Sequence, residues 1–159
     1  WNINLIETGK NTMTGGRLKR LKKHIGQETF MMTYGDGLSN VNLKKLLKFH
    51  KKNKKLVTLT AVRPPTRFGA LQLKGDLVNC FKEKSKIDEN WINGGFFVIE
   101  PGFFKFLKND HTVLERRPLE STAKKKQLVA FRHEGFWQCM DTKKDKDVLN
   151  EILSKRKKF

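Results

Sequence analysis

The stretch Phe30–Gly37 (FMMTYGDG) decides how the rest of the chain is interpreted. It begins as a short apolar run, which is typical of a strand buried on both faces of a parallel sheet. It ends in Tyr-Gly-Asp-Gly, where two glycines let the backbone turn sharply and approach a ligand closely. Ligands of open α/β sheets bind beyond the carboxyl ends of the strands, so Asp36 is a candidate ligand for a cation such as Mg²⁺ on a phosphate substrate. An ordinary Asp-Gly turn after a strand is the simpler alternative.

The composition is that of a basic globular domain. The chain has 159 residues, enough for one domain with a real core, and a formal net charge of +18. So basic a chain invites a nucleic-acid interpretation. However, the lysines are spread along the whole chain, and they outnumber arginine, the residue preferred for bidentate contacts to phosphate and guanine. We therefore expect no nucleic-acid partner, and a basic nucleic-acid or polyanion-binding module remains the alternative function.

Cysteine and histidine spacing argues against a zinc site. Cys80 and Cys139 lie far apart without a CxxC pattern, and the four histidines form no metal-binding motif. Two thiols in a reducing cytoplasm are the default interpretation. No apolar run has the length of a membrane span and no signal peptide is visible, so we expect a cytoplasmic protein with no membrane partner.

Hydrophobic periodicity predicts an alternation of strands and helices. A strand, a helix and a strand between residues 30 and 62 form a predicted βαβ unit. Strands are expected at residues 2–7, 30–33, 57–62, 70–73, 78–84, 91–99 and 129–133. Helices are expected from Gly15 through Ile25, over 43–50, 101–107 and 114–126, and at the C-terminus, where Val148, Leu149, Ile152 and Leu153 form the buried stripe.

Local signals refine this outline. The pair Gly15-Gly16 before a helix offers backbone N–H groups to an anion, or is simply a flexible loop. Ser39 or Asn40 is expected to cap the helix that follows, and Thr142 or Asp141 the last one. His50 is interpreted as a helix-end residue rather than a catalyst. The glycines at 94 and 95 interrupt a strand, which indicates a bulge or the close approach of another group.

Five stretches, taken together and in order, resemble the glucose-1-phosphate cytidylyltransferases of the sugar-phosphate nucleotidyltransferase family. They are Thr14–Arg20 (TGGRLKR), Tyr34–Gly37 (YGDG), Arg67–Leu71 (RFGAL), Phe81–Lys84 (FKEK) with Ile92–Phe97 (INGGFF), and Gly135–Thr142 (GFWQCMDT). The resemblance implies an α/β fold, a nucleotidyltransferase-type (Rossmann-like) mixed sheet flanked by helices. It also implies Mg²⁺-dependent formation of CDP-glucose and pyrophosphate from CTP and glucose 1-phosphate, by in-line attack of the sugar phosphate.

The resemblance also implies roles for individual residues. Asp36 and Asp141 match the family's two metal-binding aspartates and, with Lys84, form the expected catalytic set. Glu83 matches the residue that binds the sugar hydroxyls and Lys84 the one that binds the sugar phosphate, although Ser85 replaces the proline that usually follows. The other expected substrate-binding residues are Thr14, Gly15, Gly16, Arg17, Tyr34, Gly35, Gly69, Asn93 and Gly94.

One family motif is absent from the sequence. The glycine-rich Gly-Gly-x-Gly-Thr-Arg loop, which holds the triphosphate in the family, does not occur. The expectation is therefore that residues 1–159 are the C-terminal portion of a single nucleotidyltransferase domain, truncated at its N-terminus and inactive on its own. An unpaired sheet edge would favour pairing with another chain, so we expect a homo-oligomer or a complementing chain.

Overall fold

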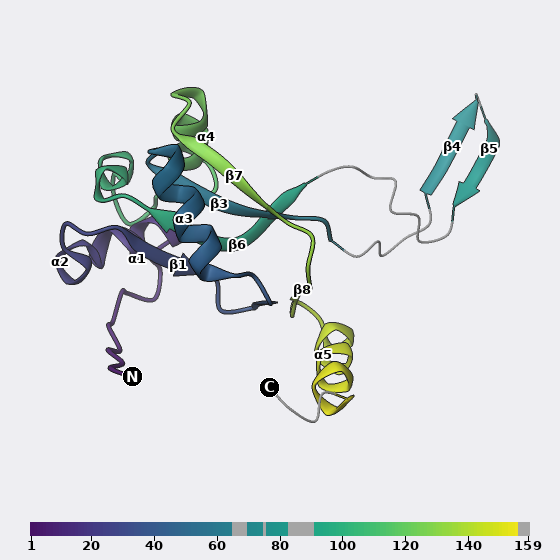
Figure 1. Cartoon of the computed structure of the whole chain (residues 1–159), viewed down its shortest axis with the longest axis horizontal. Helices are drawn as coiled ribbons and strands as arrows, with labels where there is room; N and C mark the ends of the chain where they lie inside the picture. Colours follow the sequence, from purple (N-terminus) through teal and green to yellow (C-terminus); the bar gives the residue numbers. More distant parts are fainter. Residues whose placement is uncertain (65–69, 75, 83–90, 156–159) are drawn as a thin grey trace. The chain divides into compact units, whose positions relative to one another are not determined.

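A computed structural model describes residues 1–64, 70–74, 76–82 and 91–155 of the chain (Figure 1). The chain divides into two compact units. The first unit comprises Trp1–Thr33, Asn42–Thr60 and Gly95–Phe131, and the second comprises Tyr34–Val41, Ala61–Gly94 and Arg132–Phe159.

The main sheet has four strands in the order β1-β6-β3-β7. Strand β1 pairs antiparallel with β6, so that Phe30 lies opposite Ile99. Five of the six residues of β3 are buried, as expected for a run rich in Val and Thr. These strands confirm four of the sequence predictions. Their bounds are β1 Phe30–Thr33, β3 Val57–Val62, β6 Ile92–Ile99 and β7 Leu128–His133.

Strand β1 is less buried than its apolar sequence predicted. Its residues alternate between half-buried and exposed, and Met31 is 42% exposed. In the described part of the chain β1 stands at the end of the strand order, beside β6 alone. The prediction of burial on both faces is therefore wrong. A strand that is covered on both faces buries every residue, whereas β1 leaves every second residue exposed.

Helix α3, Leu43–Asn53, lies across this sheet (Figure 1). Its fully buried Leu46 lines a small apolar hollow together with Met32 of β1 and Phe97 of β6. Farther along, Phe49 meets Phe131 of β7 edge to face, with ring centroids 5.4 Å apart. The helix thus joins strands from both ends of the sheet.

The cap of α3 is not one of the two predicted residues. Asn42 accepts a hydrogen bond from the backbone N–H of Lys45 at 2.9 Å, which satisfies a donor that the first turn leaves unpaired. Ser39 instead belongs to strand β2, Gly37–Ser39, and donates its hydroxyl to the Phe136 carbonyl at 2.9 Å. The prediction of Ser39 or Asn40 as the cap is wrong because pairing in β2 extends the chain past both residues.

His50 stands in the last turn of α3, as predicted, and is buried. Its Nδ1 lies 2.8 Å from Thr58 Oγ1, and its Nε2 lies 2.8 Å from Glu100 Oε1. Glu100 Oε1 also accepts a hydrogen bond from Thr29 at 2.9 Å. A buried polar ring is stable only when its nitrogen atoms are paired, so this network links α3 to β3 and to the end of β6.

The predicted N-terminal strand is wrong. Residues 2–7 form no regular structure, and Ile3 and Leu5 are 72% and 95% exposed. Alternation of apolar residues stabilises a strand only if a neighbouring strand takes up its backbone hydrogen bonds, and no such neighbour exists among the described residues. Regular structure begins with α1, Thr14–Arg20, and α2, Lys22–Ile25, which together match the predicted helix.

Two further segments complete the first unit. The predicted helix at Pro101 is the 3₁₀ helix η1, Pro101–Phe106, whose Phe104 stacks on Phe30 of β1 at 5.7 Å. Helix α4, Arg117–Lys124, is shorter than the predicted range of 114–126. It begins later because Pro118 favours the first turn of a helix, where its missing N–H costs nothing.

The second unit holds two antiparallel pairs and a helix. The strands predicted at 70–73 and 78–84 are confirmed as β4, Ala70–Lys74, and β5, Leu77–Lys82, which pair antiparallel. Strand β2 pairs with β8, Trp137–Cys139, and α5, Lys143–Lys155, follows β8. Only part of the predicted stripe on α5 is covered: Leu149 is buried, whereas Val148 and Leu153 are 37% and 45% exposed. No helix in the described part of the chain is long and apolar enough to cross a bilayer.

Candidate functional site

The β2–β8 ladder brings the two predicted metal-binding aspartates to one place in the second unit. Gly37 lies opposite Cys139, and beyond that pair the Met140 N–H donates to the Asp36 carbonyl at 2.9 Å. Asp36 therefore faces Met140 across the ladder, and Asp141 is the next residue along. Both aspartates are exposed. Asp36 and Asp141, about a hundred positions apart in the sequence, are therefore close along the paired backbone.

The predicted sugar-contacting pair joins the same group. The indole N–H of Trp137 donates to the Gly94 carbonyl at 2.8 Å, which ties β8 to the start of β6. The Asn93 side-chain amide donates to the Tyr34 hydroxyl at a longer 3.4 Å. We define the site cluster as Tyr34, Gly35, Asp36, Gly37, Asn93, Gly94 and Asp141. All seven residues belong to the second unit.

The glycines of Tyr34–Gly37 are not required by packing. A Cβ atom added at Gly35 would meet nothing within 4 Å, and one added at Gly37 would make only ordinary contacts near 4 Å. Neither glycine has a positive φ angle, so the sharp turn predicted there does not depend on glycine. The space above Gly35 is open, and a ligand could lie against the backbone there.

The loop that carries Asp141 is held by Asp145, which the sequence analysis missed. Asp145 Oδ2 accepts from the backbone N–H of Thr142 at 3.0 Å and from that of Asp141 at 3.3 Å. The Thr142 hydroxyl in turn accepts from the Asp145 N–H at 3.2 Å, which confirms Thr142 as a predicted cap. This reciprocal arrangement is a capping box with aspartate at its fourth position, a spacing visible in the sequence.

The donor set of the cluster fits a hard divalent cation. Mg²⁺ binds oxygen ligands, and it usually takes one or two carboxylates and fills the rest of its shell with water and substrate phosphates. Asp36 and Asp141 supply two carboxylates, and the Cys139 thiol donates to Asp141 Oδ2 at 3.4 Å. Among the described residues no group of three His, Cys, Asp or Glu side chains could enclose a metal by itself. Two carboxylates alone would leave most of the coordination shell of such an ion to water and substrate oxygens.

The predicted loop Thr14–Arg17 belongs to the first unit, and its polar groups are engaged. The Thr14 hydroxyl donates to Glu115 at 2.9 Å and accepts from the Leu114 N–H at 2.9 Å. The Arg17 guanidinium donates to Thr8 Oγ1 at 2.8 Å and to the Lys10 carbonyl at 3.2 Å. These contacts give the loop a structural role within its own unit, beside the substrate role predicted for it.

The two glycines of this loop are packed against a neighbouring backbone. The Gly16 N–H donates to the Thr112 carbonyl at 3.1 Å, so it is not available to an anion as predicted. A Cβ atom at Gly16 would lie 2.4 Å from the Asp110 carbonyl oxygen, and one at Gly15 would lie 2.9 Å from Thr112. Three predicted residues, Gly69, Glu83 and Lys84, lie outside the described residues.

A family model described as nucleotidyl transferase matches residues 2–148. The chain belongs to the nucleotidyl transferase family. It is 46% identical over 158 residues to the glucose-1-phosphate cytidylyltransferase of Salmonella typhimurium, and equally similar to that of Salmonella typhi. These alignments cover 99% of the chain but 62% of each relative, so the chain spans about three fifths of the length of the curated relatives it matches.

Comparison with solved structures supports the same fold. A UDP-glucose pyrophosphorylase in complex with UDP-glucose matches 95% of this chain with a TM-score of 0.68, at 17% sequence identity. The match covers 64% of that structure. The predicted fold class, a nucleotidyltransferase-type mixed sheet flanked by helices, is therefore confirmed.

Proposed function

We propose that the chain is part of a sugar-phosphate nucleotidyltransferase that forms CDP-glucose and pyrophosphate from CTP and glucose 1-phosphate. The main supporting observation is the site cluster, in which the β2–β8 pairing brings the backbones of Asp36 and Asp141 close together and Trp137 of β8 donates to the Gly94 carbonyl. Relatives at 46% identity with a cytidylyltransferase name support the choice of base and sugar. The reaction needs positioning and charge neutralisation more than covalent chemistry, and the cluster accordingly holds carboxylates and open backbone.

The proposed roles follow from the chemistry of each group. Asp36 and Asp141 would hold Mg²⁺, which when bound neutralises charge on the phosphates. The Asn93 amide can donate to and accept from sugar hydroxyls. Gly35 and Gly94 leave room for the ligand against the main chain. Glu83 and Lys84 are proposed, from the family resemblance, to bind the sugar hydroxyls and the sugar phosphate.

Calorimetric titration with CDP-glucose and Mg²⁺ tests this proposal. We expect binding that is tighter for CDP-glucose than for UDP-glucose, because contacts to the base decide between such close ligands. Asp36→Ala and Asp141→Ala should each weaken binding at least about tenfold, since each removes a charged ligand of the metal. Removing Mg²⁺ with a chelator should weaken CDP-glucose binding to the wild-type chain by a similar factor, and binding to the two variants by less.

A matched control removes the same charge elsewhere in the second unit. Asp147 is exposed on α5 and lies outside the site cluster, so Asp147→Ala should bind CDP-glucose as the wild type does. Equal losses in Asp147→Ala and Asp36→Ala would contradict the proposed metal site. Absence of binding to either sugar nucleotide, together with salt-sensitive binding of duplex DNA, would instead support the basic polyanion-binding module.

A further inference from the structure

The first unit carries a second feature that the proposed function does not use, a basic hollow beside η1 and α4. Its volume is about 700 Å³, within the usual range of ligand pockets. Its lining includes five basic side chains and no carboxylate. We define the basic hollow by these five residues, which are Lys105, Lys108, His111, Arg116 and Arg117.

The floor of the hollow is apolar and its rim is charged. Pro118 is buried, and Phe106 and Val113 are half-buried, whereas all five basic residues are exposed. Low-dielectric walls concentrate the field of the charges that surround them, so a hollow of this kind attracts anions more strongly than a flat surface with the same charge.

The two arginines at the start of α4 are available to a ligand. No ion pair of Arg116 or Arg117 occurs in the part of the chain that the structure describes. Of the carboxylates close in sequence, Asp110 is paired with Arg20 and Glu115 accepts from Thr14, whereas Glu120 lies in the first turn of α4 without a salt bridge to either arginine among the described residues. A guanidinium group presents a planar fork of donors that matches phosphate oxygens.

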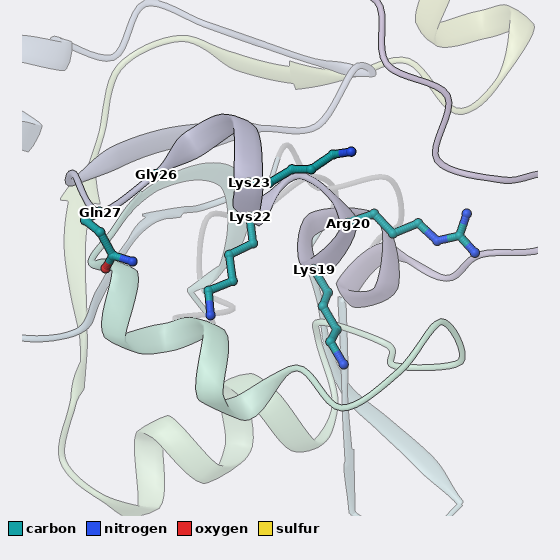
Figure 2. A pocket seen from close by; sticks show the side chains of 6 residues that line it. All are labelled: Lys19, Arg20, Lys22, Lys23, Gly26 and Gln27. Atoms are coloured by element: carbon teal, nitrogen blue, oxygen red, sulfur yellow. The ribbon is translucent and has the colours of Figure 1, made fainter.

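A second basic hollow nearby is a weaker candidate. It has a volume of about 540 Å³ and is lined by Lys19, Arg20, Lys22, Lys23, Gly26 and Gln27 (Figure 2). Figure 2 shows that the side chains of Lys19 and Lys22 extend in one direction and those of Arg20 and Lys23 in another. Its cations do not converge on one point.

Two cations of this second hollow are also already occupied. Arg20 donates from Nε and Nη2 to the two oxygens of Asp110, at 3.0 and 2.5 Å, and Lys19 donates to the Lys108 carbonyl. The hydrogen bond from Arg20 holds the pKa of Asp110 below its usual range. Of the two hollows, the one beside α4 is therefore the one whose arginines have no ion pair among the described residues.

We propose that the basic hollow binds a polyphosphate anion, either inorganic or carried by a nucleotide. Several positive charges around one cavity match a ligand with several negative charges close together, and a single orthophosphate would leave most of them unpaired. The proposal rests on residues of the first unit only and is independent of the proposed sugar-nucleotide site.

Calorimetry with inorganic tripolyphosphate, at about 150 mM salt to suppress non-specific attraction, tests the proposal. Replacing both arginines, Arg116→Gln with Arg117→Gln, should weaken tripolyphosphate binding at least about tenfold. A second double variant, Lys105→Gln with Lys108→Gln, should also weaken it. Circular dichroism checks that both variants fold, which we expect because all four side chains are exposed.

The matched control removes two positive charges from α3. Lys51 and Lys52 are exposed and do not line the hollow, so Lys51→Gln with Lys52→Gln should leave tripolyphosphate binding within about twofold of the wild type. If this control loses as much affinity as the arginine variant, binding follows net charge and the proposal is overturned. Failure of the wild-type chain to bind tripolyphosphate overturns it as well.

Comparing CTP with tripolyphosphate shows whether the polyphosphate is carried by a nucleotide. The comparison is made in the Asp36→Ala chain, in which the proposed sugar-nucleotide site is weakened. Tripolyphosphate affinity should be unchanged by Asp36→Ala, so this proposal and the proposed function fail independently. CTP bound more tightly than tripolyphosphate would identify a nucleotide as the ligand, and equal affinities would identify the phosphate chain alone. Both outcomes require that the arginine variant loses the binding.

Discussion

At the scale of single residues, Gly16 and Gly35 show two different reasons for a glycine. A Cβ atom at Gly16 would lie within 2.8 Å of three backbone atoms of Asp110, and a backbone cannot move aside cheaply. At Gly35 the same atom would meet nothing within 4 Å. The packing of the fold therefore requires the first glycine but not the second.

We predict that Gly16→Ala destabilises the chain and that Gly35→Ala does not. Overpacking against a fixed neighbour costs about 1–3 kcal/mol, which urea denaturation would detect for Gly16→Ala. Gly35→Ala should keep wild-type stability and bind CDP-glucose more weakly, because its methyl group would occupy space proposed for the ligand. A Gly35→Ala chain that bound CDP-glucose normally would show that the ligand does not lie against this backbone.

At the scale of elements, the start of α5 fixes the position of Asp141. Asp145 is buried and its carboxylate accepts from two backbone N–H groups, the Thr142 hydroxyl and the Gln138 amide. Asp145→Ala should lower the free energy of unfolding by about 1–3 kcal/mol, because it leaves buried donors unpaired. It should also weaken CDP-glucose binding through the loosened Asp141 loop.

A control on the same helix separates these effects from a general loss of charge. Glu151 is exposed and bonds to Lys155 one turn away, which lowers the pKa of Glu151. An exposed pair of this kind contributes little, so Glu151→Ala should leave both stability and CDP-glucose binding close to wild type. Asp145→Asn keeps one acceptor oxygen and should fall between the wild type and Asp145→Ala. Equal stability of Asp145→Ala and Glu151→Ala would contradict the role given to the capping box.

Helices and strands were predictable where the spacing of apolar residues in the sequence matches the residues that the fold buries. The β-branched run of β3 was located to the residue because five of its six residues are buried, and β4 and β5 were located to within two residues. The strand predicted at residues 2–7 failed because alternation does not reveal whether a partner strand exists. The cap of α3 at Asn42 was missed because the pairing of β2 with β8 is a long-range contact that no local signal encodes.

At the scale of the whole molecule, the sequence pointed to six of the seven members of the site cluster, all but Gly37, but not to the contacts that bring them together. Asp36 and Asp141 were chosen by family resemblance and by their positions after apolar runs. What joins them is the β2–β8 ladder and the Trp137 hydrogen bond to Gly94, which bridge distant segments. The basic hollow could not be predicted either, because the lysines and arginines that line it are a small part of a charge spread along the chain.

The net charge of +18 makes a prediction about the stability of the whole chain. Repulsion among so many like charges opposes compaction, whereas the ion pairs Arg20–Asp110 and Lys155–Glu151 are exposed and contribute little. Salt screens both the repulsion and the ion pairs, and repulsion is the larger effect because it involves most of the cationic surface.

Raising NaCl from about 20 to about 300 mM should therefore raise the melting temperature, by about 2–4 °C for each ~1 kcal/mol of repulsion that is screened. Scanning calorimetry with NaCl measures this, and a parallel series with tripolyphosphate adds the contribution of the basic hollow, since a ligand of the folded state stabilises it further. A melting temperature that falls with NaCl would mean that attractive pairs outweigh repulsion. If tripolyphosphate stabilised the Arg116→Gln, Arg117→Gln variant as much as the wild type, its effect would be screening alone.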